Sequence, residues 1–465
     1  MSVAITRRPP LAPLVAVACA VAIALGTQLV AVLPAAGPVG LDEPLLDGAA
    51  QAKAAAADGA AAANGPATDL ARVRADVGFW AARVAADPAN IVAAVQLAGS
   101  DMAEARMTGD VTAYLRAQAA VQGALNVEPT YAPARALLGT VLVSLHRFPE
   151  ARDLARSILS TTPDDPTALG VLGDASLELG DLATAAAAYG ELGVVSDGST
   201  ARVRAGRLAF VTGDPATAVS ADQGAVSAAN DEGLTGDQLA FYDVTLGETL
   251  LASGDESGAR AAYAAALVVR PELPAALVGL AKVDAFDGDL DPAISELDTA
   301  IAAIPLPDSL ARRADLETLR AGPGDAARAA NDLATVEVIA KLAGDAAYVY
   351  DRGLSLYLSD HGLDPARAVS LASNELAVRP DIYGYDALAW ALLNAGRAAE
   401  ADAPMRAALA AGTKDARLWY HAGLIAAANG RAAEARTDLG AALALGPALD
   451  LPARARAAAA LGRLP

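Results

Sequence analysis

The chain has 465 residues, of which 54% are hydrophobic and only 4% aromatic, so its apolar content is mostly Ala, Leu and Val. Arg7 and Arg8 are the only charged residues before Asp42, and the remainder carries 33 basic and 55 acidic residues, a net charge of −22. A surface this negative repels phosphate backbones and argues against a nucleic-acid partner. The single cysteine, Cys19, excludes an intramolecular disulfide.

An apolar stretch follows the two arginines near the N-terminus. Residues Leu14 to Leu33 are apolar except for Gly26, Thr27 and Gln28. A helix of this length spans roughly 30 Å, about the thickness of a bilayer core. We therefore expect residues 1–10 to be cytoplasmic and residues 11–36 to form a single-pass transmembrane signal anchor, which places the rest of the chain outside the cytoplasm.

Two other fates of this stretch remain open. It could be a secretory signal peptide that is removed, although its apolar run is long for one, and the protein would then be secreted. It could also carry a lipid on Cys19, although the residues around that cysteine fit a lipoprotein signal only loosely. All three fates put the downstream residues outside the cytoplasm. Residues 37–69 are rich in Ala, Gly, Asp and Pro and are expected to be a flexible linker.

A ladder of small residues with a period of 34 runs through the rest of the chain. Gly139, Ala151, Ile158 and Pro163 are spaced 12, 7 and 5 residues apart, and further sets with the same spacing stand before and after them in the chain. A fixed period of this length predicts stacked helical hairpins, and hence an all-α solenoid. The other clear sets are Ala105/Ala117/Ala124/Pro129, Gly247/Ala259/Ala266/Pro271, Ala281/Ala293/Ala300/Pro305, Ala389/Ala401/Ala408 and Gly423/Ala435/Ala442/Pro447.

The turn inside each hairpin also repeats. A Gly-Asp pair stands seven and eight residues after the small residue of the first helix, at 180–181, 213–214, 254–255 and 288–289. Glycine supplies the left-handed residue that ends one helix, and aspartate caps the next. Gly396-Arg397 and Gly430-Arg431 keep the glycine but lose the aspartate.

The repeats are expected to fall into two blocks. An N-terminal array covers residues 70–312, an irregular helical joint 313–352, and a C-terminal block 353–465. The joint is predicted because the spacing breaks around Gly322-Pro323-Gly324. Residues Ala453 to Leu464 are expected to form a final capping helix.

This pattern resembles the tetratricopeptide repeat. Trp419, Gly423, Ala435, Ala442 and Pro447 match the family's large aromatic, glycine, two alanines and proline, and about ten units of varying quality cover residues 90 to 448. The resemblance implies a right-handed superhelix whose concave groove binds peptide or protein segments. The lysine and asparagine set with which some members hold a terminal carboxylate is missing here, so chaperone-tail binding is not implied.

The sequence contains no recognisable catalytic motif. His146, His361 and His421 lie far apart, and no nucleophile–base pair, phosphate loop or metal-ligand cluster occurs, so we expect no enzyme activity, no cofactor and no metal. The resemblance instead assigns certain inner-helix positions to the groove, where aromatic and arginine side chains are common anchors of interfaces. These candidate partner-binding residues are Tyr350, Tyr357, Tyr383, Asp386, Trp390, Asn394, Arg417 and Tyr420. The alternative is that the aromatic side chains only pack between repeats.

The predicted function is that of a monomeric, membrane-tethered scaffold, of bacterial origin by its composition, that binds a protein or peptide segment in its groove. The alternative is a structural component of an envelope complex that acts by stacking of repeats. The acidic surface favours a basic or neutral partner, or it serves solubility alone.

Overall fold

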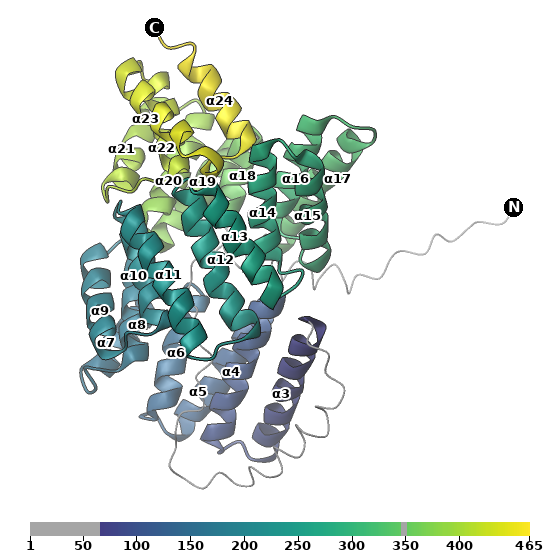
Figure 1. Ribbon diagram of the computed structural model, residues 1–465. Helices are drawn as coiled ribbons and strands as arrows, with labels where there is room; N and C mark the ends of the chain where they lie inside the picture. The colour runs from purple at the N-terminus through teal and green to yellow at the C-terminus, as the bar shows by residue number, and fades with distance from the viewer. Residues whose placement is uncertain (1–65, 346–350) are drawn as a thin grey trace, which may run out of the picture.

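The computed structural model describes residues 66–345 and 351–465, and in these residues the chain is built from 22 α-helices and one short 3-10 helix, without a strand (Figure 1). The predicted all-α solenoid is confirmed. The helices are α3 (Pro66–Ala86), α4 (Ile91–Thr108), α5 (Val111–Val127), α6 (Ala132–Ser144), α7 (Phe148–Leu159), α8 (Pro166–Glu178), α9 (Leu182–Val195), α10 (Ser199–Val211), α11 (Pro215–Asp231), α12 (Gly236–Ala252), α13 (Glu256–Val269), α14 (Pro274–Asp287), α15 (Leu290–Ala303), α16 (Pro307–Arg320), α17 (Asp325–Asp345), α18 (Asp351–Asp360), α19 (Pro365–Val378), α20 (Ile382–Asn394), α21 (Ala398–Leu409), α22 (Ala416–Ala428), α23 (Ala432–Ala444), η1 (Gly446–Ala448) and α24 (Leu451–Leu461).

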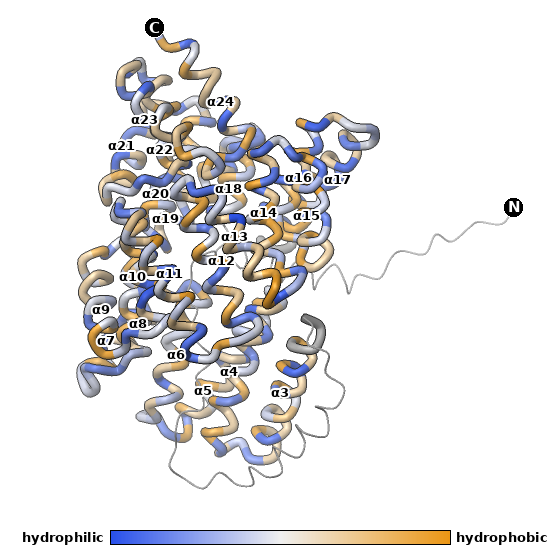
Figure 2. Tube along the Cα trace, viewed as in Figure 1, coloured by the Kyte–Doolittle hydropathy of each residue, from blue (hydrophilic) through white to orange (hydrophobic). Residues whose placement is uncertain are grey.

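Local chemistry at the turns sets the ends of most helices. Gly180, Gly213 and Gly254 adopt positive φ, and the aspartate after each of them accepts a hydrogen bond from a backbone N–H in the first turn of the next helix. Where arginine replaces this aspartate, at Arg397 and Arg431, its guanidinium pairs with a glutamate three residues later. Hydrophilic residues gather at several of these turns, between helices that are largely apolar (Figure 2).

Small residues of the ladder lie where helices meet most closely. Ala151, Ala259 and Ala435 have no exposed surface. A Cβ atom on Gly247 would lie 2.6 Å from the ring of Tyr263, so only glycine lets this ring lie against α12. The ladder thus marks the contacts between paired helices, as its spacing predicts.

The C-terminal helices lie directly against the turns of the middle of the chain. A Cβ atom on Gly180 would lie 2.5 Å from the carbonyl oxygen of Pro380, and one on Gly213 would lie 2.0 Å from that of Gly412. One apolar core joins Leu177 and Val211 to residues of α20, α21 and α22. The stack of hairpins therefore closes on itself, and α20 and α21 lie next to α10 (Figure 1). We call this contact between α8–α10 and α20–α22 the seam.

The segment expected to be an irregular joint is mostly regular. Helices α16 and α17 pair as a further hairpin, and α17 is 21 residues long, which accounts for the break in spacing. Residues 346–350 lie outside the described residues. Near the end of the described residues, α24 packs on α22 and α23.

The expected transmembrane anchor at 11–36 and almost all of the linker at 37–69 lie outside the described residues. Helix α3 already begins at Pro66, slightly before the expected start of the array. Among the helices of the described residues, none is both long and apolar enough to cross a bilayer.

Candidate functional site

The predicted groove residues come together in space, but several of them are buried. Tyr350 lies outside the described residues. Asp386 and Trp390 have no exposed surface, Tyr420 is 3% exposed and Tyr357 is 7% exposed. The structure therefore corrects the expectation that these four side chains line an open groove: in this conformation no partner can reach them.

The capping helix explains why Trp390 and Tyr420 are buried. Ala457 and Ala460 of α24 share one apolar core with both aromatic residues. The guanidinium of Arg456, also on α24, lies 4.8 Å from the centre of the Trp390 ring. Helix α24 thus covers the side of α20 and α22 on which Trp390 and Tyr420 lie.

Several polar groups next to Trp390 are bonded to one another inside the protein. Its ring stacks on His421 at 3.9 Å, and its Nε1–H donates a hydrogen bond of 2.8 Å to Asp360. Burial raises the pKa of Asp360 to about 6. His421 in turn is bonded through Nδ1 to Asp386 at 2.7 Å. A cluster with this much internal bonding positions three inner helices, α18, α20 and α22, against one another.

The other predicted residues, Tyr383, Asn394 and Arg417, are partly exposed. The side chain of Arg417 is 43% exposed, and its guanidinium lies 5.7 Å from the centre of the Tyr383 ring. Nε of Arg417 and Oδ2 of Asp386 are 3.7 Å apart, and neither has a hydrogen-bond partner. Burial raises the pKa of the Tyr383 hydroxyl, so Tyr383 stays neutral. Of the predicted set, Arg417 is the charged residue that keeps access to solvent.

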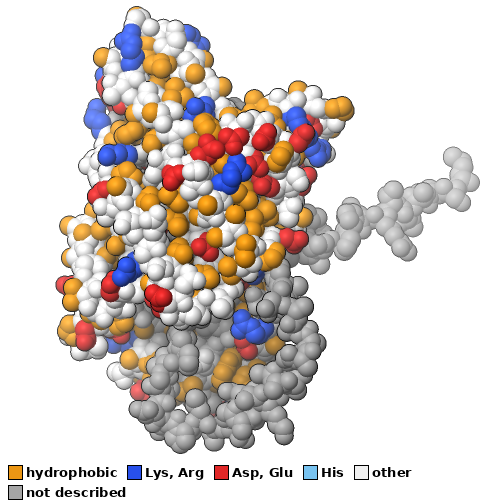
Figure 3. Space-filling view, viewed as in Figure 1, with side chains coloured by type: hydrophobic (Ala, Val, Ile, Leu, Met, Phe, Trp, Pro, Cys, Tyr) orange, Lys and Arg blue, Asp and Glu red, His pale blue; other side chains and the backbone are white. Residues whose placement is uncertain are grey.

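Arg417 faces charged groups from other inner helices. Asp308 and Arg312 on α16 are 3.7 Å apart, and the Asp308 side chain is 46% exposed. Burial alone would raise the pKa of Asp308, but Arg312, Lys282 and Arg417 hold it below its usual value. These charged groups come from α14, α16 and α22. We call these residues, with Asp450 beside Arg312, the inner charged face. In Figure 3, acidic and basic side chains lie side by side over α14 and α16.

A buried ion-pair network crosses the seam. The carboxylate of Glu178, at the end of α8, is fully buried between Arg207 of α10 and Arg379, which lies between α19 and α20. Nη2 of Arg379 is 2.6 Å from that carboxylate. Burial alone would raise the pKa of Glu178, but Arg379 and Arg207 outweigh it and lower that pKa. Arg352 extends the network to Asp381 at 2.6 Å.

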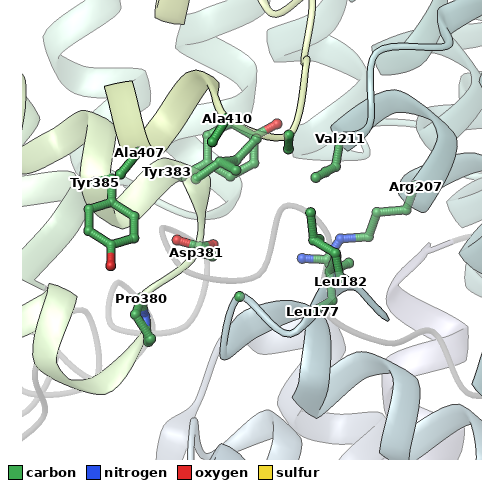
Figure 4. Close-up of a pocket in the computed structure, with 13 residues that line it drawn as sticks. Leu177, Leu182, Arg207, Val211, Pro380, Asp381, Tyr383, Tyr385, Ala407 and Ala410 are labelled. Atoms are coloured by element: carbon green, nitrogen blue, oxygen red, sulfur yellow. The ribbon is translucent and has the colours of Figure 1, made fainter. Parts of the chain in front are cut away.

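A pocket of about 220 Å³ lies in the seam beside this network (Figure 4). The side chains of Tyr383, Tyr385 and Asp381 border it on one side, and those of Leu177 and Arg207 on the other. The remaining lining residues are Gly180, Leu182, Val211, Pro380, Ile382, Ala407, Ala410 and Ala411. The walls of the pocket thus come from residues about 200 positions apart in the chain.

Of the residues that line the seam pocket or form its ion-pair network, sequence reasoning found only Tyr383. Glu178 stands between Leu177 and Leu179 in a helix whose only other charged residue is Asp174, and a charge at such a position signals a buried partner. The partner itself could not be found, because Arg379 is 201 residues away. No group of three or more His, Cys, Asp or Glu side chains able to hold a metal occurs in the part of the chain that the structure describes.

Comparison with known proteins agrees with the architecture. The tetratricopeptide repeat model matches residues 136–197 and 387–450. No curated protein matches the sequence.

Several solved structures resemble the chain at low identity. PilW, a widely conserved type IV pilus biogenesis factor, is 16% identical, with a TM-score of 0.38, over 44% of this chain and 90% of its own. A tetratricopeptide repeat protein from Parabacteroides merdae ATCC 43184 is 17% identical, with a TM-score of 0.32, over 57% of this chain and 98% of its own. The APC/C hetero-tetramer Cut9-Hcn1 gives 16% identity and a TM-score of 0.30 over 85% of this chain and 94% of that one.

Proposed function

We propose that this chain is a non-enzymatic scaffold that binds a protein or peptide segment, and that residues 11–36 hold it in the cell membrane with its repeats outside the cytoplasm. The tetratricopeptide repeats favour protein binding, because stacked hairpins build an extended surface rather than a catalytic cleft. The proposal needs a place on that surface where a partner can be recognised.

The observation that carries the proposal is the inner charged face. Lys282, Asp308, Arg312 and Arg417 come from three inner helices, and the three cations all lower the pKa of Asp308. Two of them, Asp308 and Arg417, keep nearly half of their side-chain surface exposed. Charges of opposite sign that act on each other and still reach solvent can exchange their internal pairs for those of a partner, which gives register and specificity.

A charge reversal tests this role. The full chain, purified in lipid nanodiscs, is used to capture partners from an envelope extract, and the affinity of each purified partner is then measured. We expect Asp308→Lys combined with Arg417→Glu to weaken that affinity at least tenfold. The matched control reverses an exposed pair on the outer turn, Arg397→Glu with Glu400→Lys, where the two side chains are 46% and 59% exposed. Equal affinity in the two double variants would exclude the inner charged face as the binding surface.

The membrane orientation has its own test. Intact spheroplasts are treated with protease, and the repeats are followed with an antibody. Digestion of the repeats in intact spheroplasts supports the proposed orientation. Protection that lasts until the membrane is lysed would contradict the orientation, and recovery of all the protein in the soluble fraction would contradict the anchor.

The alternative, a structural part that acts by end-to-end stacking of repeats, is less well supported. Such stacking needs an open apolar face on the last hairpin. Helix α24 covers this face, and Leu449, Ala457 and Ala460 are buried against α22 and α23. The C-terminal end of the stack is therefore closed to a second copy.

A further inference from the structure

Helix α24 is held by fewer buried residues than the helices beneath it. Its buried residues are Ala457 and Ala460, and Leu451 and Leu461 at its two ends are partly buried. Most residues of α22, by contrast, are buried. An element with few buried apolar contacts is among the first to open while the rest of a protein stays folded. We therefore expect α24 to leave the stack more readily than α22 does.

Arg456 of α24 contacts three of the residues that the repeat pattern assigns to a groove. Its guanidinium lies 4.8 Å from the centre of the Trp390 ring, and its Nη2 donates a hydrogen bond of 3.2 Å to Oδ1 of Asn394. Burial raises the pKa of the Tyr420 hydroxyl, and a hydrogen bond with Arg456 opposes that rise. We call Trp390, Asn394 and Tyr420 the covered face. Helix α24 thus lies where the repeat pattern predicts a partner segment.

The groups around Arg456 carry charges of both signs. Asp360 and Asp450 act on the same tyrosine hydroxyl as Arg456 does. Arg417 acts on Asp360, and Arg454 lies over another aromatic ring nearby on α14. Net charge therefore does not select what binds here. The selection comes from an aromatic ring and an amide oxygen, which together suit the planar guanidinium of an arginine.

We propose that the covered face binds a helix of a partner protein, and that this helix displaces α24. The partner helix presents an arginine with small residues one and four positions after it, as α24 does with Arg456, Ala457 and Ala460. Helices that dock in grooves are recognised through anchors at such spacings. The inference rests on the proposed function, because it assumes a protein partner, and it adds a contact surface to the inner charged face.

A peptide copy of α24 serves as the probe. The full chain in nanodiscs is titrated with a fluorescent peptide of residues 450–465, and binding is followed by anisotropy. In the wild type the attached α24 competes with the peptide at a high effective concentration. Ala457→Arg puts a long charged side chain at a buried position, so it should expel α24, leave the covered face unchanged and bind the peptide at least tenfold more tightly than the wild type. Ala458→Arg alters an exposed position of the same helix and should bind as weakly as the wild type.

Two further measurements guard against a folding artefact. Arg456→Glu releases α24 by a different route, because this position is exposed and the change creates no clash in the core. It should bind the peptide as the Ala457→Arg chain does. A peptide in which Arg456→Ala removes the guanidinium should bind the Ala457→Arg chain at least tenfold more weakly. In the wild type, hydrogen exchange should be at least tenfold faster in α24 than in α22.

The outcomes separate this inference from the proposed function. No binding of the peptide by either released variant, or equal binding of the two peptides, would overturn the covered face and leave the scaffold standing. Exchange in α24 at the rate of α22 would also overturn it, because α24 would then not open. A partner captured from the envelope extract should bind the Ala457→Arg chain at least tenfold more tightly than the Ala458→Arg chain. Equal affinity there would exclude the covered face as its contact, whereas the reversal at Asp308 and Arg417 tests the inner charged face alone.

Discussion

We expect the substitution Gly213→Ala to loosen the seam, because two costs meet at this glycine. Its φ is +85°, and an L-residue in this left-handed region costs roughly 1–2 kcal/mol. The new Cβ atom would also lie 2.0 Å from the carbonyl oxygen of Gly412 and 2.8 Å from its carbonyl carbon. Backbone atoms cannot move aside as the end of a long side chain can. The two layers that meet at the seam, α8–α10 and α20–α22, must therefore move apart, at an overpacking cost of about 1–3 kcal/mol.

The matched control is Gly430→Ala. Gly430 has nearly the same backbone angle, φ +79°, but nothing lies within 4 Å of the position of its Cβ atom. This variant therefore measures the backbone cost alone, roughly 1–2 kcal/mol. Subtracting it from the total for Gly213→Ala, roughly 2–5 kcal/mol, leaves the contribution of the seam.

Urea unfolding followed by circular dichroism measures both variants. Limited proteolysis under native conditions adds a local readout, because a loosened seam exposes the turns around residues 213 and 412 while the helices remain folded. Unfolding midpoints and cleavage patterns that agree between the two variants would show that the seam is not a tight contact, and the closed form of the stack would have to be abandoned.

Three further substitutions probe buried groups. Trp390→Ala should cost about 3–5 kcal/mol of stability in urea unfolding, since it empties a fully buried site and leaves Asp360 without its donor; a loss below about 1 kcal/mol would indicate an exposed ring. Arg379→Ala should cost about 3–5 kcal/mol in the same assay, because Glu178 loses one of its two buried cations, and a neutral result would contradict the network. Burial raises the pKa of Asp222 to about 7, so its protonated form favours the folded state and stability is lost as the pH rises from the unfolded pKa toward 7. The stability of Asp222→Asn relative to the wild type should therefore rise between about pH 4 and about pH 7 in urea unfolding, and a constant difference would refute the shift.

The repeat architecture could be predicted because its causes are local. A glycine with positive φ ends one helix, and the aspartate after it caps the next helix, so both effects involve only neighbouring residues. The alanines that let two paired helices touch also recur at a fixed spacing within one hairpin. The stretch expected to be a final helix, Ala453 to Leu464, largely overlaps α24, and the Asp450 side chain accepts a hydrogen bond from the backbone N–H of Ala453 in its first turn. Each of these features can be recognised without knowing where the rest of the chain lies.

The seam could not be predicted, because it depends on how the small rotations of successive hairpins add up. No local pattern reveals that Gly213 meets Gly412, or that Glu178 finds Arg379 across 201 residues. The same limit explains the error about Trp390. The repeat pattern places Trp390 on an inner helix. It does not reveal that α24 packs over this residue, because that contact joins parts of the chain that are far apart in sequence.

Closure of the stack changes how this scaffold can respond to a partner. In an open solenoid each repeat contacts only its neighbours, so a ligand stabilises the repeats that it touches and few others. Here Leu177 and Val211 share a core with helices of the C-terminal block, and Arg379 anchors that block to α8. Any group bound in the seam pocket would contact both of these layers at once. Its binding energy would then oppose separation of the layers, so strength at the seam and occupancy of the pocket should rise and fall together.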